Sequence, residues 1–229
     1  MELTLTFIIM DKLFRFSKLA AIIILVLAAL SALCFLIDFF TIINITEYSD
    51  LQKLDDAYDR FFWITPSLLI LEMATIVVFG SLIYKFSANG SPLRTPAVIG
   101  IISAVIVMVR CFMAFSGIII EDFMMYRNTL VLLSSISIIG FLISFIWLSR
   151  YFNERKIKLL CIAYPVLSAL PFILSITFLP GLFVRSFYFD GGLIVTIDIG
   201  MIVIDTVFTP LCMIILSAFY YMFYKMSTK

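Results

Sequence analysis

The stretch AVIGIISAVIVMVRCFMAFSGIII, residues 97–120, decides the fold of this chain. It is 24 residues long, and its only charged side chain is that of Arg110, near the middle. About 20 consecutive apolar residues are enough for a helix to cross the hydrocarbon core of a membrane. An arginine at the centre of such a helix costs about 2.5–3.5 kcal/mol on insertion scales. The rest of the chain is therefore expected to supply a polar partner for Arg110.

The composition of the whole chain points to the same class of protein. Of the 229 residues, 63% are hydrophobic and 14% are charged, and the mean hydropathy is +1.16. Soluble domains are about 45–50% apolar and about 25% charged. We therefore expect an integral membrane protein whose main partner is the lipid bilayer.

Six apolar stretches predict an all-α integral membrane protein, a six-transmembrane-helix bundle in which residues 1–229 form a single polytopic domain. The predicted spans are residues 19–43, 61–84, 97–120, 129–149, 159–179 and 193–224. Between the first two spans the chain is polar, and Leu51–Tyr58 is expected to form at most a short surface helix there. Pro66 lies near the start of the second span, where proline is tolerated. At the N-terminus, Met10 and the basic segment after it favour a start of translation at Met10.

The lysines and arginines predict the orientation of the bundle. Six spans put both termini on one side, and that side carries eleven basic residues: Lys12, Arg15, Lys18, Lys85, Arg94, Arg150, Arg155, Lys156, Lys158, Lys225 and Lys229. The other side carries four, namely Lys53, Arg60, Arg127 and Arg185. Cytoplasmic loops carry the excess of Lys and Arg. We therefore expect an N-in, C-in protein of the cell membrane, with both termini cytoplasmic.

Five ionisable residues fall within the predicted spans: Asp38, Glu72, Arg110, Asp198 and Asp205. At a rise of about 1.5 Å per residue, Asp38 and Asp198 lie roughly 7–8 Å deep, Glu72 and Arg110 about 15–17 Å, and Asp205 about 18 Å. Glu72 or Asp205 can therefore pair with Arg110 if spans 2, 3 and 6 are adjacent. Buried acids without partners take up protons or hold a cation. One hypothesis is thus an outward-opening polar cavity that uses these five residues as an ion or substrate pathway. The alternative is that Glu72 and Arg110 form a structural clasp, that Asp38 and Asp198 are interfacial, and that Asp205 is protonated or hydrogen-bonded.

Several function classes are disfavoured by what the chain lacks. It has no histidine, no P-loop and no GxGxxG motif, and its four cysteines fall singly in apolar spans at positions 34, 111, 161 and 212. Histidine-based nucleophile pairs and metal clusters are therefore excluded, and the spacing of the cysteines favours packing roles. The net charge of +1 gives no field that would attract nucleic acid. We expect no catalytic residues, no metal, no cofactor and no nucleic-acid partner.

Two functions remain open. The first is a small transporter or permease subunit that handles a proton, a cation or a small polar solute through Glu72, Arg110 and Asp205. The second is a non-transporting membrane partner, such as an assembly, immunity or sensory-scaffold protein, whose loops contact a protein partner subunit. The first depends on the polar core and the second on the segment Asn44–Arg60.

Overall fold

A computed structural model gives the arrangement of the chain. It describes residues 2–44, 51–87, 91–115, 123–177, 184–188 and 194–226. Within these ranges the side-chain environment is described for residues 11–37, 39–41, 44, 63–85, 87, 91–113, 128–174 and 207–226.

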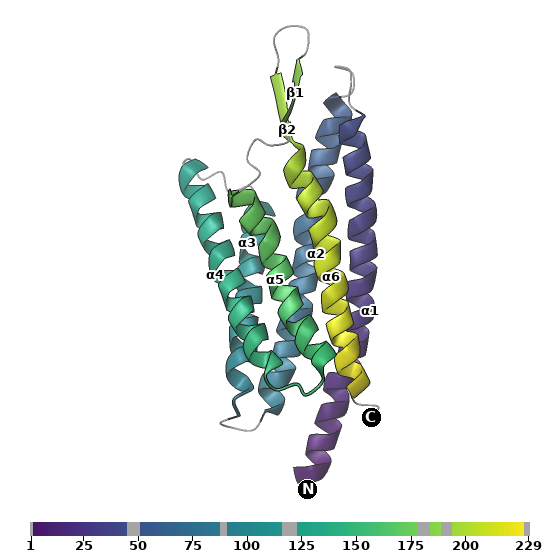
Figure 1. Ribbon diagram of the computed structural model, residues 1–229, viewed down its shortest axis with the longest axis vertical. Helices are drawn as coiled ribbons and strands as arrows, with labels where there is room; N and C mark the ends of the chain where they lie inside the picture. The colour runs from purple at the N-terminus through teal and green to yellow at the C-terminus, as the bar shows by residue number, and fades with distance from the viewer. Residues whose placement is uncertain are drawn as a thin grey trace.

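The described residues form six helices and one β-hairpin (Figure 1). The helices are α1 (Glu2–Ile43), α2 (Leu51–Phe86), α3 (Arg94–Phe115), α4 (Phe123–Ser149), α5 (Arg155–Thr177) and α6 (Ile199–Lys225), and the hairpin consists of β1 (Val184–Tyr188) and β2 (Ile194–Asp198). Each of the six helices contains a stretch that is long enough and apolar enough to cross a membrane. The predicted six-span membrane protein is confirmed at this level.

The six helices form a closed ring in the order of the sequence. Each helix packs against the next one along the chain, and α6 packs against α1. Figure 1 shows α5 and α6 in front, α2 and α3 behind them, and α1 and α4 at the two sides. The two chain ends lie at the same end of the ring, opposite the hairpin.

The surface of the ring is apolar and its interior contains polar groups. Large hydrophobic side chains are exposed along the outer faces of the helices, among them Leu19, Phe112, Leu132, Leu159 and Val207. Buried polar side chains include Ser31, Glu72, Thr75, Ser103, Ser134, Ser137, Ser144 and Ser217. Water would favour the opposite arrangement, whereas lipid tails solvate the apolar faces and leave polar groups to find partners inside the protein.

The first five helices begin earlier than the predicted spans, and the difference is largest for α1, which starts at Glu2 and not at residue 19. The segment Leu51–Tyr58 is helical, but it forms the first turns of α2 and not a separate surface helix. Pro66 consequently lies inside α2, a position that helices in a membrane tolerate because neighbouring groups satisfy the freed carbonyl. The predicted loop over residues 121–128 is also shorter, because α4 begins at Phe123. Hydropathy identifies the part of a helix that lies in lipid, but it does not predict helical turns that extend beyond the lipid.

The predicted all-α fold holds for the six-helix bundle, but a short hairpin corrects the prediction of a helix that starts at residue 193. Residues 194–198 form β2, which pairs antiparallel with β1, and α6 starts only at Ile199. Four of the five residues in β2 are Ile, Val or Thr, whose branched side chains favour strands. Asp198 is therefore the last residue of a strand and not part of the sixth helix. Residues 189–193, which connect the two strands, lie outside the described part of the chain.

Small residues let α3 approach both of its neighbours closely. A Cβ atom added at Gly80 of α2 would lie 3.2 Å from the carbonyl oxygen of Ala97 in α3. A Cβ atom added at Gly140 of α4 would collide with the hydroxyl of Ser103 in α3. Ser144 of α4 donates a hydrogen bond of 2.7 Å to the carbonyl oxygen of Pro96, which ties the same two helices together. Small residues and hydroxyl groups are the usual means by which helices associate in lipid.

We predict that Gly140→Leu lowers the free energy of unfolding by about 1–3 kcal/mol, because the larger side chain forces α3 and α4 apart. The measurement is thermal or denaturant unfolding of the purified protein in detergent. Ile139→Leu is the matched control, since Ile139 is the neighbouring residue and is 56% exposed. Equal stability of the two variants would contradict the close contact between α3 and α4.

Candidate functional site

A cavity of about 320 Å³ lies inside the ring of helices. Its size is at the lower end of the range for small-molecule sites, which is about 300–1,000 Å³. It is lined from five of the six helices by Thr65, Leu69, Glu72, Met73, Val107, Arg110, Ser137, Ile138, Phe141, Tyr164, Ser168, Pro171, Phe172, Phe208, Thr209 and Cys212. A cavity that mixes hydroxyls, a carboxyl group, a guanidinium group and aromatic rings is suited to a small polar ligand.

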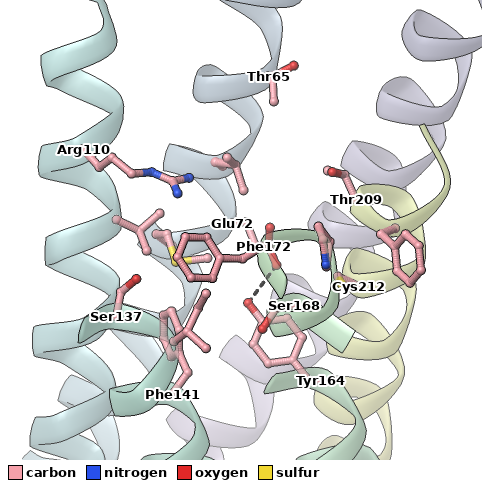
Figure 2. Close-up of a pocket in the computed structure, with 16 residues that line it drawn as sticks. Thr65, Glu72, Arg110, Ser137, Phe141, Tyr164, Ser168, Phe172, Thr209 and Cys212 are labelled. Atoms are coloured by element: carbon pink, nitrogen blue, oxygen red, sulfur yellow. Dashed lines mark hydrogen bonds between the residues drawn. The ribbon is translucent and has the colours of Figure 1, made fainter. Parts of the chain in front are cut away.

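Glu72 is the buried acid of this cavity. It lies on the inner face of α2, where residues 68, 72, 75 and 79 are all buried at the helical spacings of four, three and four. Only 3% of its surface is exposed. The hydroxyl of Tyr164 in α5 donates a hydrogen bond of 2.8 Å to Glu72 Oε1 (Figure 2). This contact joins α2 to a helix that is not its neighbour in the ring.

Arg110 reaches the same cavity from α3. Its Nη1 donates a hydrogen bond of 2.8 Å to the hydroxyl oxygen of Ser134 in α4. The Ser134 hydroxyl uses its own proton in a bond of 2.8 Å to the carbonyl oxygen of Leu130, so its lone pairs are free to accept from Arg110. Figure 2 shows the guanidinium group directed toward the interior of the ring, on the opposite side of Glu72 from Tyr164. Among the described side chains, the polar partner of Arg110 is thus a serine and not Glu72.

The structure brings together only part of the predicted core. Glu72 and Arg110 line one cavity from adjacent helices, as expected, but no salt bridge joins them among the described side chains. The expected side-by-side placement of spans 2, 3 and 6 holds for α2 and α3, whereas α6 packs mainly against α1 and α5. The ring follows the order of the sequence, so α6 reaches the cavity from the side opposite α3.

For the three predicted aspartates, the structure describes the backbone but not the side chains. Asp38 lies in α1 and Asp205 in α6, and their side chains lie outside the described part of the structure. Asp205 precedes Thr209 by four residues and Cys212 by seven, and both of these line the cavity. Asp198 ends β2 and does not belong to a membrane-crossing helix.

Two functional contacts were missed from the sequence. Tyr164 lies nine residues into α5, about 14 Å along the helix, which is deeper than a tyrosine that anchors a helix at the membrane surface. Its depth is therefore a signal of a buried role. Ser134 gives no comparable signal, because α4 carries several serines at similar spacing, including residues 135 and 137.

A cluster of aromatic side chains closes the ring on the side of the termini. This aromatic cluster consists of Phe79, Phe145, Phe152, Phe219, Tyr220 and Phe223, whose neighbouring ring centroids are 5.2 to 6.3 Å apart. Phe79 follows Glu72 by seven residues and Phe219 follows Cys212 by seven, so the cluster lies about two helical turns, or about 10 Å, below the cavity. Tyr164 connects the cavity and the aromatic cluster. Its ring centroid lies 5.1 Å from that of Phe145, and its hydroxyl donates a hydrogen bond to Glu72.

Among the described residues, two groups of the cavity retain unused hydrogen-bonding capacity. The Thr65 hydroxyl oxygen is buried and has no hydrogen-bond partner among the described residues. Arg110 donates one described bond out of the five N–H groups that a guanidinium group carries. No three cysteine or acidic side chains within the described ranges lie close enough to hold a metal ion. The four cysteines are free thiols, and Cys212 is the one that lines the cavity.

Comparison with known proteins gives no assignment. No protein-family model matches the chain, and no curated protein or solved structure does so either. What the fold establishes is the class, which is a multi-pass membrane protein built as a ring of six helices.

We predict that the Tyr164–Glu72 contact stabilises the fold. In a double-mutant cycle with Tyr164→Phe and Glu72→Met, the coupling free energy is expected to be about 0.6–1.7 kcal/mol, the range found for hydrogen bonds between membrane helices. The measurement is the free energy of unfolding of the wild type, both single variants and the double variant. A second cycle with Ser144→Ala and Glu72→Met serves as the control, because Ser144 bonds to Pro96 outside the cavity. Equal coupling in the two cycles would contradict a specific contact.

Proposed function

We propose that the protein is a small transporter or a permease subunit, and that its central cavity handles a proton, a cation or a small polar solute. The observation that carries this proposal is a buried carboxyl group and a guanidinium group on one cavity inside a ring of membrane-crossing helices. Ionisable groups at this depth are costly, and in membrane proteins they commonly mark a substrate or proton pathway.

The contacts of the two groups favour a pathway over a structural clasp. A clasp would join Glu72 to Arg110 directly. Each of them is instead held by a hydroxyl group, Tyr164 for the carboxyl group and Ser134 for the guanidinium group. The two groups thus stay separate and both face the cavity. A transporter also needs its site closed at one end, and the aromatic cluster provides such a closure on the side of the termini.

We predict that purified protein in proteoliposomes transports at least one member of a panel of protons, alkali cations and small polar solutes. Glu72→Gln and Arg110→Gln are each expected to lower that flux at least about tenfold, because each removes a charged hydrogen-bonding group from the pathway. The flux of Asp205→Asn is measured in the same series, because Asp205 is the third residue of the predicted pathway. Asp11→Asn and Arg15→Gln are the matched controls, since these two residues form an exposed ion pair outside the cavity.

Folded variants that leave every flux and every binding signal unchanged would overturn the transport proposal. Folding is checked independently by size-exclusion profile and unfolding temperature. A variant that is misfolded is replaced by Glu72→Asp or Arg110→Lys, which retain the charge and shift its position.

A non-transporting role is the second proposal, and the hairpin is the observation that favours it. β1 and β2 project beyond the helices at the end opposite the termini (Figure 1), where they are accessible to another protein. On this proposal, replacing the hairpin or residues 44–60 abolishes function and also abolishes co-purification of a partner protein. The cavity variants, in contrast, remain active.

We further propose that the protein resides in the plasma membrane and that both of its termini face the cytoplasm. The support is the distribution of basic residues. The end of the ring that holds the termini also holds the first part of α1, the link between α4 and α5 and the end of α6 (Figure 1). These segments carry Arg15, Lys18, Arg150, Arg155, Lys156 and Lys225. Positively charged segments are retained on the cytoplasmic side.

We predict that Lys156→Cys is protected from a membrane-impermeant maleimide in intact cells and becomes labelled after permeabilisation. Ser186→Cys, in the hairpin, is expected to be labelled in intact cells. The wild type reports the background from the native cysteines, three of which are buried. The reverse labelling pattern would overturn the orientation and would leave the cavity proposal intact.

A further inference from the structure

The cavity contains two groups of opposite formal charge that do not neutralise one another. Glu72 and Arg110 both line it, yet each bonds to a different hydroxyl group on a different helix. In a low-dielectric interior, opposite charges attract strongly and would approach one another if nothing held them apart. The bonds to Tyr164 and Ser134 hold them in place, so a space bounded by an acceptor and a donor remains between them.

Both groups can accept a ligand in addition to their present partners. A carboxylate has about four acceptor positions, and the described structure uses one of them on Glu72 Oε1. Arg110 donates one described bond through Nη1, which leaves further N–H groups of the guanidinium fork for a planar carboxylate. The buried Thr65 hydroxyl, without a described partner, adds a further polar group at the same cavity.

We propose that this cavity binds a small zwitterion, a solute that carries one ammonium group and one carboxylate group. The ammonium group pairs with the ionised carboxylate of Glu72, and the carboxylate group pairs with the guanidinium group of Arg110. Among the described side chains, a cation alone would leave Arg110 without a counter-charge, and an anion alone would leave Glu72 without one. An unpaired charge in a buried site is strongly unfavourable. The proposal names the substrate class of the proposed transporter and rests on that function only for the transport step.

The volume and the walls of the cavity limit the ligand further. About 320 Å³ corresponds to the volume of roughly ten water molecules, at about 30 Å³ each. Apolar surface from Phe141, Phe172 and Phe208 lines the cavity beside the charged groups. The ligand that fits is therefore a compact zwitterion with a short hydrocarbon portion, such as a small aliphatic amino acid.

Binding to the purified full-length protein in nanodiscs tests the proposal. The probes are L-valine and 4-aminobutyrate, which differ in the separation of their charges, and two single-charge analogues of valine, isobutylamine and isovalerate. Isothermal titration calorimetry measures the affinity of each probe. We expect at least one zwitterion to bind at least about tenfold more tightly than both analogues, and we expect Glu72→Gln and Arg110→Gln each to weaken that binding about tenfold to a hundredfold.

The controls separate binding from stability. Asp11→Asn and Arg15→Gln should bind the zwitterion like the wild type, because this ion pair lies outside the cavity. Arg110→Lys keeps the charge without the fork and is expected to retain part of the affinity. Isobutylamine or isovalerate binding as tightly as the zwitterions would overturn the proposal, and so would the absence of binding of both zwitterions to folded protein.

The outcome is distinguishable from the outcome of the transport experiment. Zwitterion binding without flux supports the present proposal and overturns transport. Flux of protons or alkali cations that depends on Glu72, without zwitterion binding, supports transport and overturns the present proposal.

Discussion

A charged side chain in the hydrocarbon core of a membrane has to find its partners inside the protein, and the interior of this ring is arranged around that constraint. The carboxyl group of Glu72 accepts from Tyr164, and the guanidinium group of Arg110 donates to Ser134. These bonds connect α2 with α5 and α3 with α4. The same contacts that satisfy the two groups therefore also tie together two pairs of helices.

The coarse architecture was predictable because hydropathy and length alone identify helices that cross a membrane. Arg110 was also informative, since an arginine in an apolar stretch requires a polar group at its own depth, and both it and Glu72 line one cavity. The identity of the partner was not predictable. Serine is common in membrane helices for packing reasons, so nothing in the sequence distinguishes Ser134 from its neighbours.

The remaining differences have a physical reason as well. Helix α2 begins several turns before its apolar part, and the hairpin replaces the start of the predicted sixth span. Both lie near the ends of the spans, where the hydropathy signal weakens and local preferences decide. The run of branched residues at 194–197 was apolar enough to be counted with the helix, although such residues favour a strand. Asp198 was consequently assigned to the sixth helix, although it is the last residue of a strand.

The interior of the ring is divided into two regions with different chemistry. The region near Glu72 is a cavity with both polar and apolar walls, and the region near Phe79 and Phe219 is filled by aromatic rings. Tyr164 belongs to both, because its ring packs on Phe145 and its hydroxyl meets Glu72. Tyr164 therefore forms a direct contact between the cavity and the aromatic cluster.

The closure of the ring by α6 and α1 has a consequence for biosynthesis. Five of the six helix contacts join neighbours in the chain, so they can form as each hairpin of helices leaves the ribosome and enters the bilayer. The contact between α1 and α6, which includes the bond from Ser217 to the carbonyl oxygen of Ala21, joins the first helix to the last. Until α6 has been inserted, no helix closes the gap between α1 and α5, and the polar side chains that line the cavity are uncovered on that side. The nascent protein thus has to shield that side with lipid headgroups, water or an insertion factor during most of its synthesis, and a chain truncated before α6 would retain this defect permanently.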